Sequence, residues 1–333
     1  MEPLEEFLAK VPRAQLLPGP TPLHPMARFC VQPGVQPLIK RDDMTGIGPG
    51  GNKIRSLEFL LGQAMAEGCD CVLAAGPEQS NLCTLTAAVC ARLGLACELV
   101  HNSDRPEQAR GNLLLNRLLG VRSHFLGPVS GEERNAWMEK LSEQYRQQGR
   151  RPFVVRNGAS TGCGALGYAA AAVELQKQCR EMRISSLTLF APGGNGGVAA
   201  GLVYGNALLG GPFRIVVVSV EDEAPVLEAH METVIRQAEA ITGLPCPAPV
   251  HQLCTITDQY RGGGWGINTP DSAEMVAAFA RMEGIFEGIF IENVYTSKVL
   301  VGMEDWVRTG KATGAVCYLH TGGFGSLFSQ YEE

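Results

Sequence analysis

Residues 191–197 read APGGNGG and separate a short apolar run at residues 186–191 from a longer apolar pattern at residues 198–208. The short run predicts a buried strand and the longer pattern a helix. Glycines at such a junction free the backbone to wrap an anion, and the first N–H groups of the helix face it. Because the GxGxxG spacing of a dinucleotide site is absent, a cradle for a single phosphate is the better interpretation. Its predicted residues are Gly193, Gly194, Asn195, Gly196 and Gly197.

The same alternation of strand and helix extends in both directions from this segment. Strands are predicted at residues 37–41, 71–75, 96–100, 152–156, 186–191, 214–220 and 315–320. Helices are predicted at residues 54–67, 81–93, 132–148, 164–178, 198–208, 272–282 and 297–308. Successive helix–strand units imply parallel sheets with right-handed crossovers, so the predicted fold class is α/β. The proline-rich residues 243–255 lack periodicity and are predicted to form a surface loop.

Composition excludes several classes of protein. The chain has 333 residues, 45% of them hydrophobic, which suffices for two domains or one elaborated domain. Its net charge of −6 offers no basic footprint for nucleic acid or an anionic membrane. No signal peptide and no apolar run near the ~20 residues of a membrane span is visible, so a cytoplasmic location is expected. Eleven irregularly spaced cysteines without a paired CxxC predict reduced thiols and no metal site.

Residues 50–53 (GGNK) stand directly before a predicted helix. A lysine at a helix start lies in the positive end of the helix dipole, which disfavours its protonated form and favours a nucleophilic amine. Taken alone, Lys53 could equally be an exposed lysine without a chemical role. The segment is not a nucleotide-binding P-loop, because the GxxxxGK[ST] spacing is absent.

Three further segments place small polar residues where predicted strands end. In residues 76–81 (GPEQSN), Ser80 and Asn81 suit helix capping, and the same turn exposes backbone N–H groups that could hold a carboxylate. Residues 294–298 (VYTSK) and 320–323 (HTGG) form similar clusters. Each alone could be an ordinary turn. Together they predict one ligand site, since α/β proteins bind ligands at such edges.

A phosphate cradle combined with an activated lysine suggests pyridoxal 5'-phosphate, which needs both. Here the sequence resembles the D-cysteine desulfhydrase and 1-aminocyclopropane-1-carboxylate deaminase family, in the tryptophan-synthase-β-like group of pyridoxal-phosphate enzymes (fold type II). The resemblance covers nearly the whole chain, with its motifs in the family's order. They are PTPL at residues 20–23, IKRDD at 39–43, GGNKIRSLEFL at 50–60, QSN at 79–81, GALGY at 164–168, the glycine loop, VYTSK and HTGG.

The resemblance implies roles for individual residues. Lys53 would bind the cofactor covalently, Asn81 would contact the oxygen of its ring hydroxyl, and Thr296 would face its pyridine nitrogen. Ser80 would hold the substrate carboxylate and assist proton transfer, and Tyr295 would lie against the active site. The expected cofactor contacts are Lys53, Asn81, Gly193, Gly194, Asn195, Gly196, Gly197, Thr296 and Thr321. The expected substrate contacts are Gln79, Ser80, Asn81, Leu82, Trp265 and Tyr295.

Thr296 bears on the reaction. A carboxylate partner would keep the pyridine nitrogen protonated and favour long-lived carbanions, whereas a threonine hydroxyl leaves it neutral and suits rapid loss of a group from Cβ. The deaminase branch carries glutamate at this position, so opening of a cyclopropane is disfavoured. The expected reaction is α,β-elimination that gives pyruvate and ammonia, with Lys53 as the simplest base.

The substrate is the most open question. Where the family usually has a tyrosine, this chain has Trp265, which makes the pocket more apolar and favours an uncharged thiol. Cysteine, the D isomer ahead of the L isomer, is therefore the expected substrate, and hydrogen sulfide the expected product. The alternative is L-cysteate, which releases sulfite and would need a cation such as Arg156 or Arg261. A 1-aminocyclopropane-1-carboxylate deaminase and a non-catalytic pyridoxal-phosphate binder are less favoured.

The resemblance also implies an organisation of the chain. Residues 1–52 and 161–333 would form a large cofactor-binding domain and residues 53–160 a small α/β domain, with the active site in the cleft between them. The expected partner is a small amino acid, and a homodimer is the expected assembly.

Overall fold

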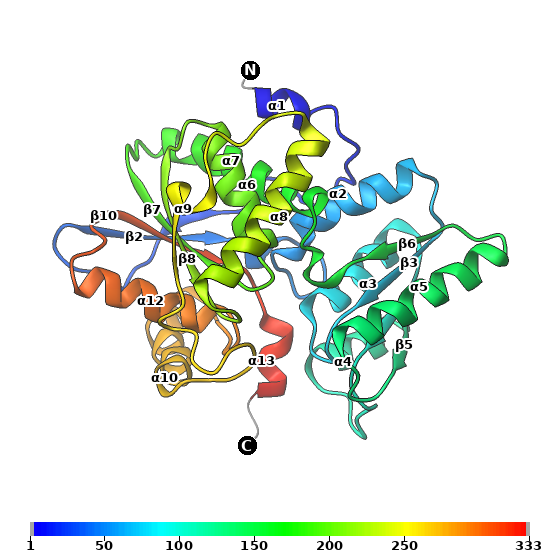
Figure 1. The fold of residues 1–333 in the computed structure, drawn as a ribbon. Coiled ribbons are helices and arrows are strands. Elements are labelled where there is room, and N and C mark those ends of the chain that lie inside the picture. Colours follow the sequence, from blue (N-terminus) through cyan, green and yellow to red (C-terminus); the bar gives the residue numbers. More distant parts are fainter. Residues whose placement is uncertain (1–2, 331–333) are drawn as a thin grey trace.

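The computed structural model describes residues 3–330, whose strands form two sheets (Figure 1). The larger sheet has the order β1 (Leu23–Pro25), β2 (Val35–Arg41), β10 (Gly314–His320), β7 (Leu187–Gly193), β8 (Phe213–Ser219) and β9 (Cys254–Thr257). The smaller has the order β5 (Arg122–Phe125), β4 (Ala96–His101), β3 (Cys71–Ala75) and β6 (Pro152–Val155). All neighbouring pairs are parallel except β1 with β2. The predicted α/β class is confirmed.

Helices cover both faces of the larger sheet. Along β8, Ile215 and Val217 belong to one hydrophobic cluster while Val216 and Val218 belong to another, because successive strand residues point to opposite faces. The first cluster is completed by α6 (Gly162–Glu181), α7 (Gly197–Leu208) and α8 (Ala224–Thr242). The second is completed by α10 (Pro270–Phe279) and α12 (Thr296–Arg308). A parallel sheet buried on both faces explains why its strands are continuous apolar runs.

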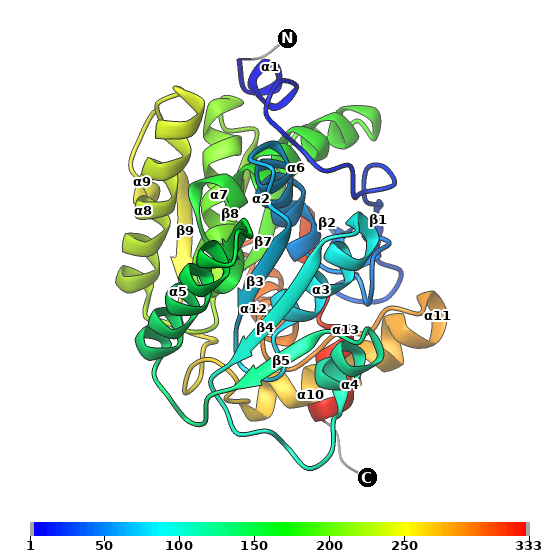
Figure 2. The ribbon, with the colours of Figure 1, turned by 90° about the vertical axis from the view of Figure 1, so that its right-hand side faces the viewer.

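The smaller sheet is covered in the same way (Figure 2). Val72 and Ala74 of β3 pack with α2 (Lys53–Ala66) and α3 (Asn81–Leu93), while Leu73 and Ala75 pack with α5 (Gly131–Gln147). All four strands of this sheet lie within residues 53–160. The domain boundaries given above remain a prediction.

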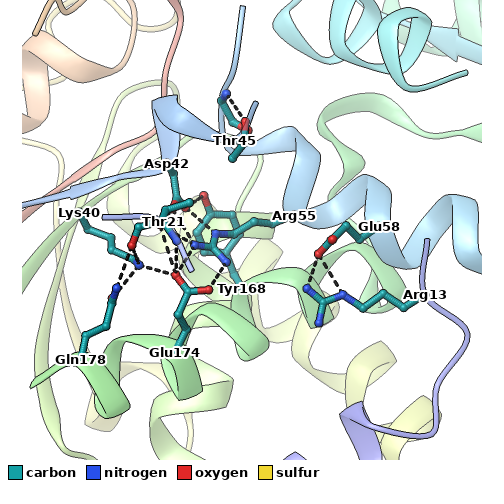
Figure 3. A network of polar contacts seen from close by, with 11 residues as sticks. Arg13, Thr21, Lys40, Asp42, Thr45, Arg55, Glu58, Tyr168, Glu174 and Gln178 are labelled. Atoms are coloured by element: carbon teal, nitrogen blue, oxygen red, sulfur yellow. Dashed lines mark hydrogen bonds and ion pairs between the residues drawn. The ribbon is translucent and has the colours of Figure 1, made fainter. Parts of the chain in front are cut away.

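Helix α2 connects the two halves, because it packs against both α6 and α3. Its first turn carries Arg55, which is 1% exposed and forms two hydrogen bonds of 2.8 Å to the carboxylate of Asp42. Arg55 also donates to both oxygens of Glu174 on α6, and Lys40 of β2 pairs with the same carboxylate (Figure 3). Tyr168 donates to Asp42 at 2.7 Å. This buried network fixes the start of α2 relative to the larger sheet.

Several elements differ from the sequence predictions. The predicted loop at residues 243–255 contains α9 (Val250–Leu253) and the start of β9, so that part of the prediction is wrong. Strand β9 pairs only with β8 and lies at the sheet edge, where a short, half-buried strand needs no apolar run. The predicted helix at residues 272–282 continues into a π-helical turn, Ala280–Gly284. Elements without a specific prediction are β1, β5, α1 (Pro3–Leu8), η1 (Asp42–Met44), α4 (Gly111–Leu118), η2 (Asn157–Ala159), α8, α11 (Ile285–Glu287) and α13 (Phe324–Gln330).

All eleven cysteines are free thiols. Among the helices of the described residues, none has the length and apolar character needed to cross a membrane.

Candidate active site

A cavity of about 360 Å³ lies where the carboxyl ends of strands from both sheets meet. Residues that follow β3, β4, β7 and β10 all contribute to its wall, and the volume is in the usual range for small-molecule sites. Most of the site residues expected from the sequence line it. They are Lys53, Gln79, Ser80, Asn81, Leu82, Gly194, Asn195, Gly196, Gly197, Trp265, Tyr295 and Thr321.

Lys53 is the first residue of α2, as the sequence predicts. Its Nζ donates a hydrogen bond of 2.8 Å to the carbonyl oxygen of Gly158. Burial lowers the pKa of the Lys53 amine from 10.5 to about 8, although the Glu221 carboxylate opposes this shift. The backbone before Lys53 passes close to that of Asp43. Gly50, with φ +73°, permits this contact, since a Cβ there would lie 1.8 Å from the carbonyl oxygen of Asp43. A substantial fraction of the amine is therefore neutral near pH 8.

The turn before α3 both caps that helix and forms a candidate anion-binding site. Ser80 is the N-cap residue, and its Oγ accepts a hydrogen bond of 3.3 Å from the backbone N–H of Cys83. The side chains of Gln79 and Asn81 accept hydrogen bonds from Asn112, which anchors the start of α4. Ser80, Asn81 and Leu82 nevertheless line the cavity, where the first N–H groups of α3 can meet a carboxylate.

The glycine loop lies between β7 and α7. Gly193 is the last residue of β7 and does not line the cavity: a Cβ there would lie 2.4 Å from Leu227, so its small size serves packing. Gly196 is the N-cap of α7 with φ +83°. The Gly197 N–H donates a hydrogen bond of 3.2 Å to the Ser160 Oγ. The cavity is thus bordered by Gly194 to Gly197 and the helix start.

Tyr295 and Trp265 form one side of the cavity. The Trp265 Nε1–H donates a hydrogen bond of 2.6 Å to the Tyr295 hydroxyl, and burial raises the pKa of that hydroxyl well above its ordinary value. Thr296 is not among the residues that line the cavity. Its Oγ1 lies 2.9 Å from the carbonyl oxygen of Glu292 and accepts a 2.7 Å hydrogen bond from the Glu292 N–H. The Glu292 carboxylate caps α12 and lines the cavity.

The cavity contains polar residues that sequence reasoning missed. Glu221 follows β8, and its Oε2 has no hydrogen-bond partner among residues 3–330; burial raises the pKa of its carboxyl group. Asn102 follows β4, and Arg134 lies on α5. The two arginines considered from the sequence lie elsewhere: Arg156 is 71% exposed, and Arg261 contacts the backbone of Glu221 outside the lining.

Arg134 had a signal in the sequence. It continues the buried stripe of α5 that Met138, Leu141 and Ser142 form at helical spacing. A charged residue at the head of such a stripe is a candidate for a site. Nowhere in the described chain do three or more His, Cys, Asp or Glu side chains gather as a metal-binding group would.

Comparison with protein families decides the cofactor. The family model described as "Pyridoxal-phosphate dependent enzyme" matches residues 14–322. The chain belongs to this family. Proteins of Pyrococcus abyssi and Pyrococcus horikoshii, named as candidate 1-aminocyclopropane-1-carboxylate deaminases, are 30% and 33% identical to it. The alignments cover 99% and 97% of this chain, and 97% and 95% of those proteins.

A solved structure described as a homologue of 1-aminocyclopropane-1-carboxylate deaminase superposes with a TM-score of 0.88. It is 31% identical and the match covers 99% of this chain and 97% of that one. The tryptophan-synthase-β-like resemblance, fold type II and pyridoxal 5'-phosphate as cofactor are therefore confirmed.

The cavity fits this cofactor. A phosphate monoester needs backbone N–H groups that no side chain blocks, and Gly194 and Gly196 before α7 carry no side chain. An aldehyde needs a neutral amine, which Lys53 supplies because its pKa is lowered. Both requirements are met within one cavity.

The lowered pKa of Lys53 predicts how attachment depends on pH. When pyridoxal phosphate is added to cofactor-free protein, the attachment rate should rise with pH through a midpoint near 8, because only the neutral amine reacts. Stopped-flow absorbance measures this rate, and N-acetyl-lysine serves as the control with a midpoint near ~10.4. A midpoint for the protein close to that of the control would contradict the assignment.

The glycine loop gives a second prediction. Gly194→Val and Gly196→Val should each raise the Kd for pyridoxal phosphate at least about tenfold, or ~1.4 kcal/mol, since a side chain blocks backbone approach. At Gly194 a Cβ would lie 3.2 Å from the Tyr295 ring, and at Gly196 the positive φ adds strain. Gly19→Val is the control, because a Cβ there meets nothing within 4 Å. Equal affinity in all variants would mean that the loop does not hold the phosphate.

Proposed function

We propose that this chain catalyses an α,β-elimination on a three-carbon amino acid with sulfur on Cβ, releasing pyruvate, ammonia and the sulfur group. The observation that supports the proposal most is the convergence of three helix starts on one cavity. The start of α2 carries a nucleophilic amine, and the starts of α3 and α7 form two separate anion-binding sites. A phosphorylated cofactor and an amino-acid carboxylate require this combination.

Lys53 has two tasks in this proposal. It holds the cofactor and, once displaced by substrate, moves the proton at Cα. When bound, pyridoxal phosphate supplies a conjugated ring that accepts the electron pair left at Cα. A base whose pKa lies near the operating pH is the most effective, and the pKa of about 8 at Lys53 suits this task.

The remaining residues orient the reactants. Ser80 and the first N–H groups of α3 would hold the substrate carboxylate, and Asn81 and Thr321 would contact the cofactor. The hydrogen-bonded pair of Trp265 and Tyr295 would exclude water from the side on which the leaving group departs. Gln79 and Leu82 would complete the substrate pocket.

Three candidate substrates are considered, and they differ in the group carried by Cβ. The sequence favours cysteine, D ahead of L, because Trp265 makes the pocket apolar. L-cysteate is the second candidate, and Arg134 in the cavity wall supports it. The names of the relatives bring 1-aminocyclopropane-1-carboxylate as a third substrate. The resemblance implies a glutamate at position 296 for a deaminase, so Thr296 argues against this substrate, although Thr296 lies outside the cavity lining.

A substrate panel tests the proposal. Purified protein loaded with pyridoxal phosphate is assayed with D- and L-cysteine, L-cysteate, β-chloroalanine and 1-aminocyclopropane-1-carboxylate. The expected result is pyruvate from the β-substituted amino acids. A four-carbon 2-oxo acid from the cyclopropane substrate would favour the deaminase, and no product from any substrate would favour a non-catalytic binder.

The expected homodimer belongs to the same proposal. Large apolar side chains on α4, α11 and α13 are well exposed, among them Leu118 at 75% and Phe328 at 61%. Such a surface is consistent with a partner chain.

A further inference from the structure

A buried arginine, Arg134, borders the cavity without a charged partner. It lies in the first turns of α5 and is 4% exposed. Its Nη1 donates a hydrogen bond of 2.9 Å to Asn102 Oδ1, while its Nε has no partner among the described residues. Within residues 3–330, no carboxylate pairs with it. A guanidinium is effectively always protonated, so a full positive charge faces the cavity.

The neighbours of Arg134 do not neutralise this charge. Burial raises the pKa of the Cys83 thiol on α3 to about 12 and lowers the pKa of His101 on β4, so both are neutral near pH 7. Neither carboxylate in the cavity wall forms an ion pair with Arg134. Glu292 caps α12, and Glu221 has Asp222, His230 and Lys53 as its charged neighbours. A buried, unpaired cation is costly, and an anionic ligand removes that cost.

Asn102 holds Arg134 in place without cancelling its charge. The Asn102 Nδ2–H lies 3.4 Å from the carbonyl oxygen of Val129, which turns the amide oxygen toward the guanidinium. Both residues line the cavity: Asn102 directly follows β4 of the smaller sheet, and Arg134 lies on α5, which covers that sheet. The free Nε–H and the positive charge are thus presented from a rigid support.

The number of anion-binding sites in the cavity indicates what Arg134 binds. In the proposed function the start of α7 takes the cofactor phosphate, and the start of α3 takes the substrate carboxylate. Neither of these two sites uses Arg134, so the cavity has capacity for a third anion. Cysteine offers none in its thiol form, whereas an amino acid with a sulfonate on Cβ does.

We infer that Arg134, positioned by Asn102, forms a subsite for a sulfonate group on Cβ of the substrate; this rests on the function proposed above. In the elimination, the Cα–H electron pair becomes the second Cα–Cβ bond as the proton passes to the base. The Cβ–S bond breaks with its electron pair on sulfur, which leaves as sulfite from a sulfonate. Water then releases pyruvate and ammonia, and no oxidant is needed. The substrate class is that of amino acids with two acidic groups.

Binding of two inert analogues tests the subsite independently of turnover. 3-Sulfopropanoate and 3-mercaptopropanoate share a carboxylate and chain length, lack the amine that reacts with the cofactor, and differ in sulfonate against thiol. Calorimetry with the loaded enzyme should give about 10- to 100-fold tighter binding of the sulfonate, as expected for a charge-assisted hydrogen bond. In Arg134→Met this preference should disappear, while 3-mercaptopropanoate binds as in the wild type. Arg134→Lys should restore part of it.

The controls separate the possible outcomes. Arg146→Met, an exposed arginine on the same helix, should leave both affinities unchanged, and cofactor absorbance with thermal unfolding checks that Arg134→Met is folded. Equal affinities in the wild type, or a preference that survives in Arg134→Met, would overturn the inference. Equal weakening of both analogues would assign Arg134 to the substrate carboxylate and overturn it too. Sulfonate preference without pyruvate release would refute the proposed function but leave the subsite standing.

Discussion

Replacing Lys53 by alanine should abolish turnover, with a loss of at least about 10²–10⁴-fold in kcat because a general base is removed along with the cofactor's covalent anchor. The amine is poised for both tasks, since it begins α2 inside the cavity and its pKa is lowered to about 8. Lys53→Arg should be equally inactive, because a guanidinium keeps the charge but cannot act as the nucleophile. Pyruvate release measures the effect.

Lys177→Ala provides the control for this prediction. Lys177 is 59% exposed, pairs with Glu5 and does not line the cavity. It should retain full activity. Activity of Lys53→Ala within tenfold of the wild type would contradict the role given to Lys53.

Arg55→Met should destabilise the protein by about 3–5 kcal/mol, because it leaves the Asp42 carboxylate buried and unpaired. Asp42 is fully buried. Burial alone would raise the pKa of its carboxyl group, but the Arg55 guanidinium holds that pKa below its ordinary value. Urea denaturation gives the free energy of unfolding. Since α2 also carries Lys53, the loss should be accompanied by a lower kcat.

The double variant Asp42→Leu, Arg55→Met makes this prediction specific. Removing both charges removes the orphaned carboxylate, so its destabilisation should be clearly smaller than the sum of the two single effects. Lys10→Ala, which removes an exposed ion pair with Glu6, should leave the unfolding midpoint unchanged. Additive single effects would show that the network does not act as a unit.

The sequence predicts those parts of the fold and site that depend on local patterns. The apolar runs of the central strands are buried on both faces, so their positions agree with the structure within one or two residues at most ends. Lys53 at a helix start and the glycine loop before α7 follow from spacing alone. Edge strands such as β9 escape this reasoning, because half-buried residues leave no apolar run.

The site residues that the sequence did not predict escaped prediction for a different reason. Asn102 is an ordinary polar residue in the sequence, and Arg134 is marked only by its place on the buried stripe of α5. Tertiary packing alone brings the end of β4 and the start of α5 to the same cavity as Lys53. Arg156 and Arg261 were plausible by segment position, yet the strand end and loop that carry them turn away from the cavity lining. A charged residue in the sequence does not reveal whether its side chain faces the cavity. A charged side chain that is buried without a partner in the structure does indicate a binding site.

Borohydride reduction of the loaded enzyme, followed by peptide mapping, identifies the lysine that binds the cofactor. The pyridoxyl label should lie on Lys53. Two other lysines are buried, but their amines are committed elsewhere. Lys40 pairs with Glu174, and Lys298 donates to the carbonyl oxygens of Arg261 and Gly264. Label on Lys40, on Lys298 or on any lysine other than Lys53 would contradict the account.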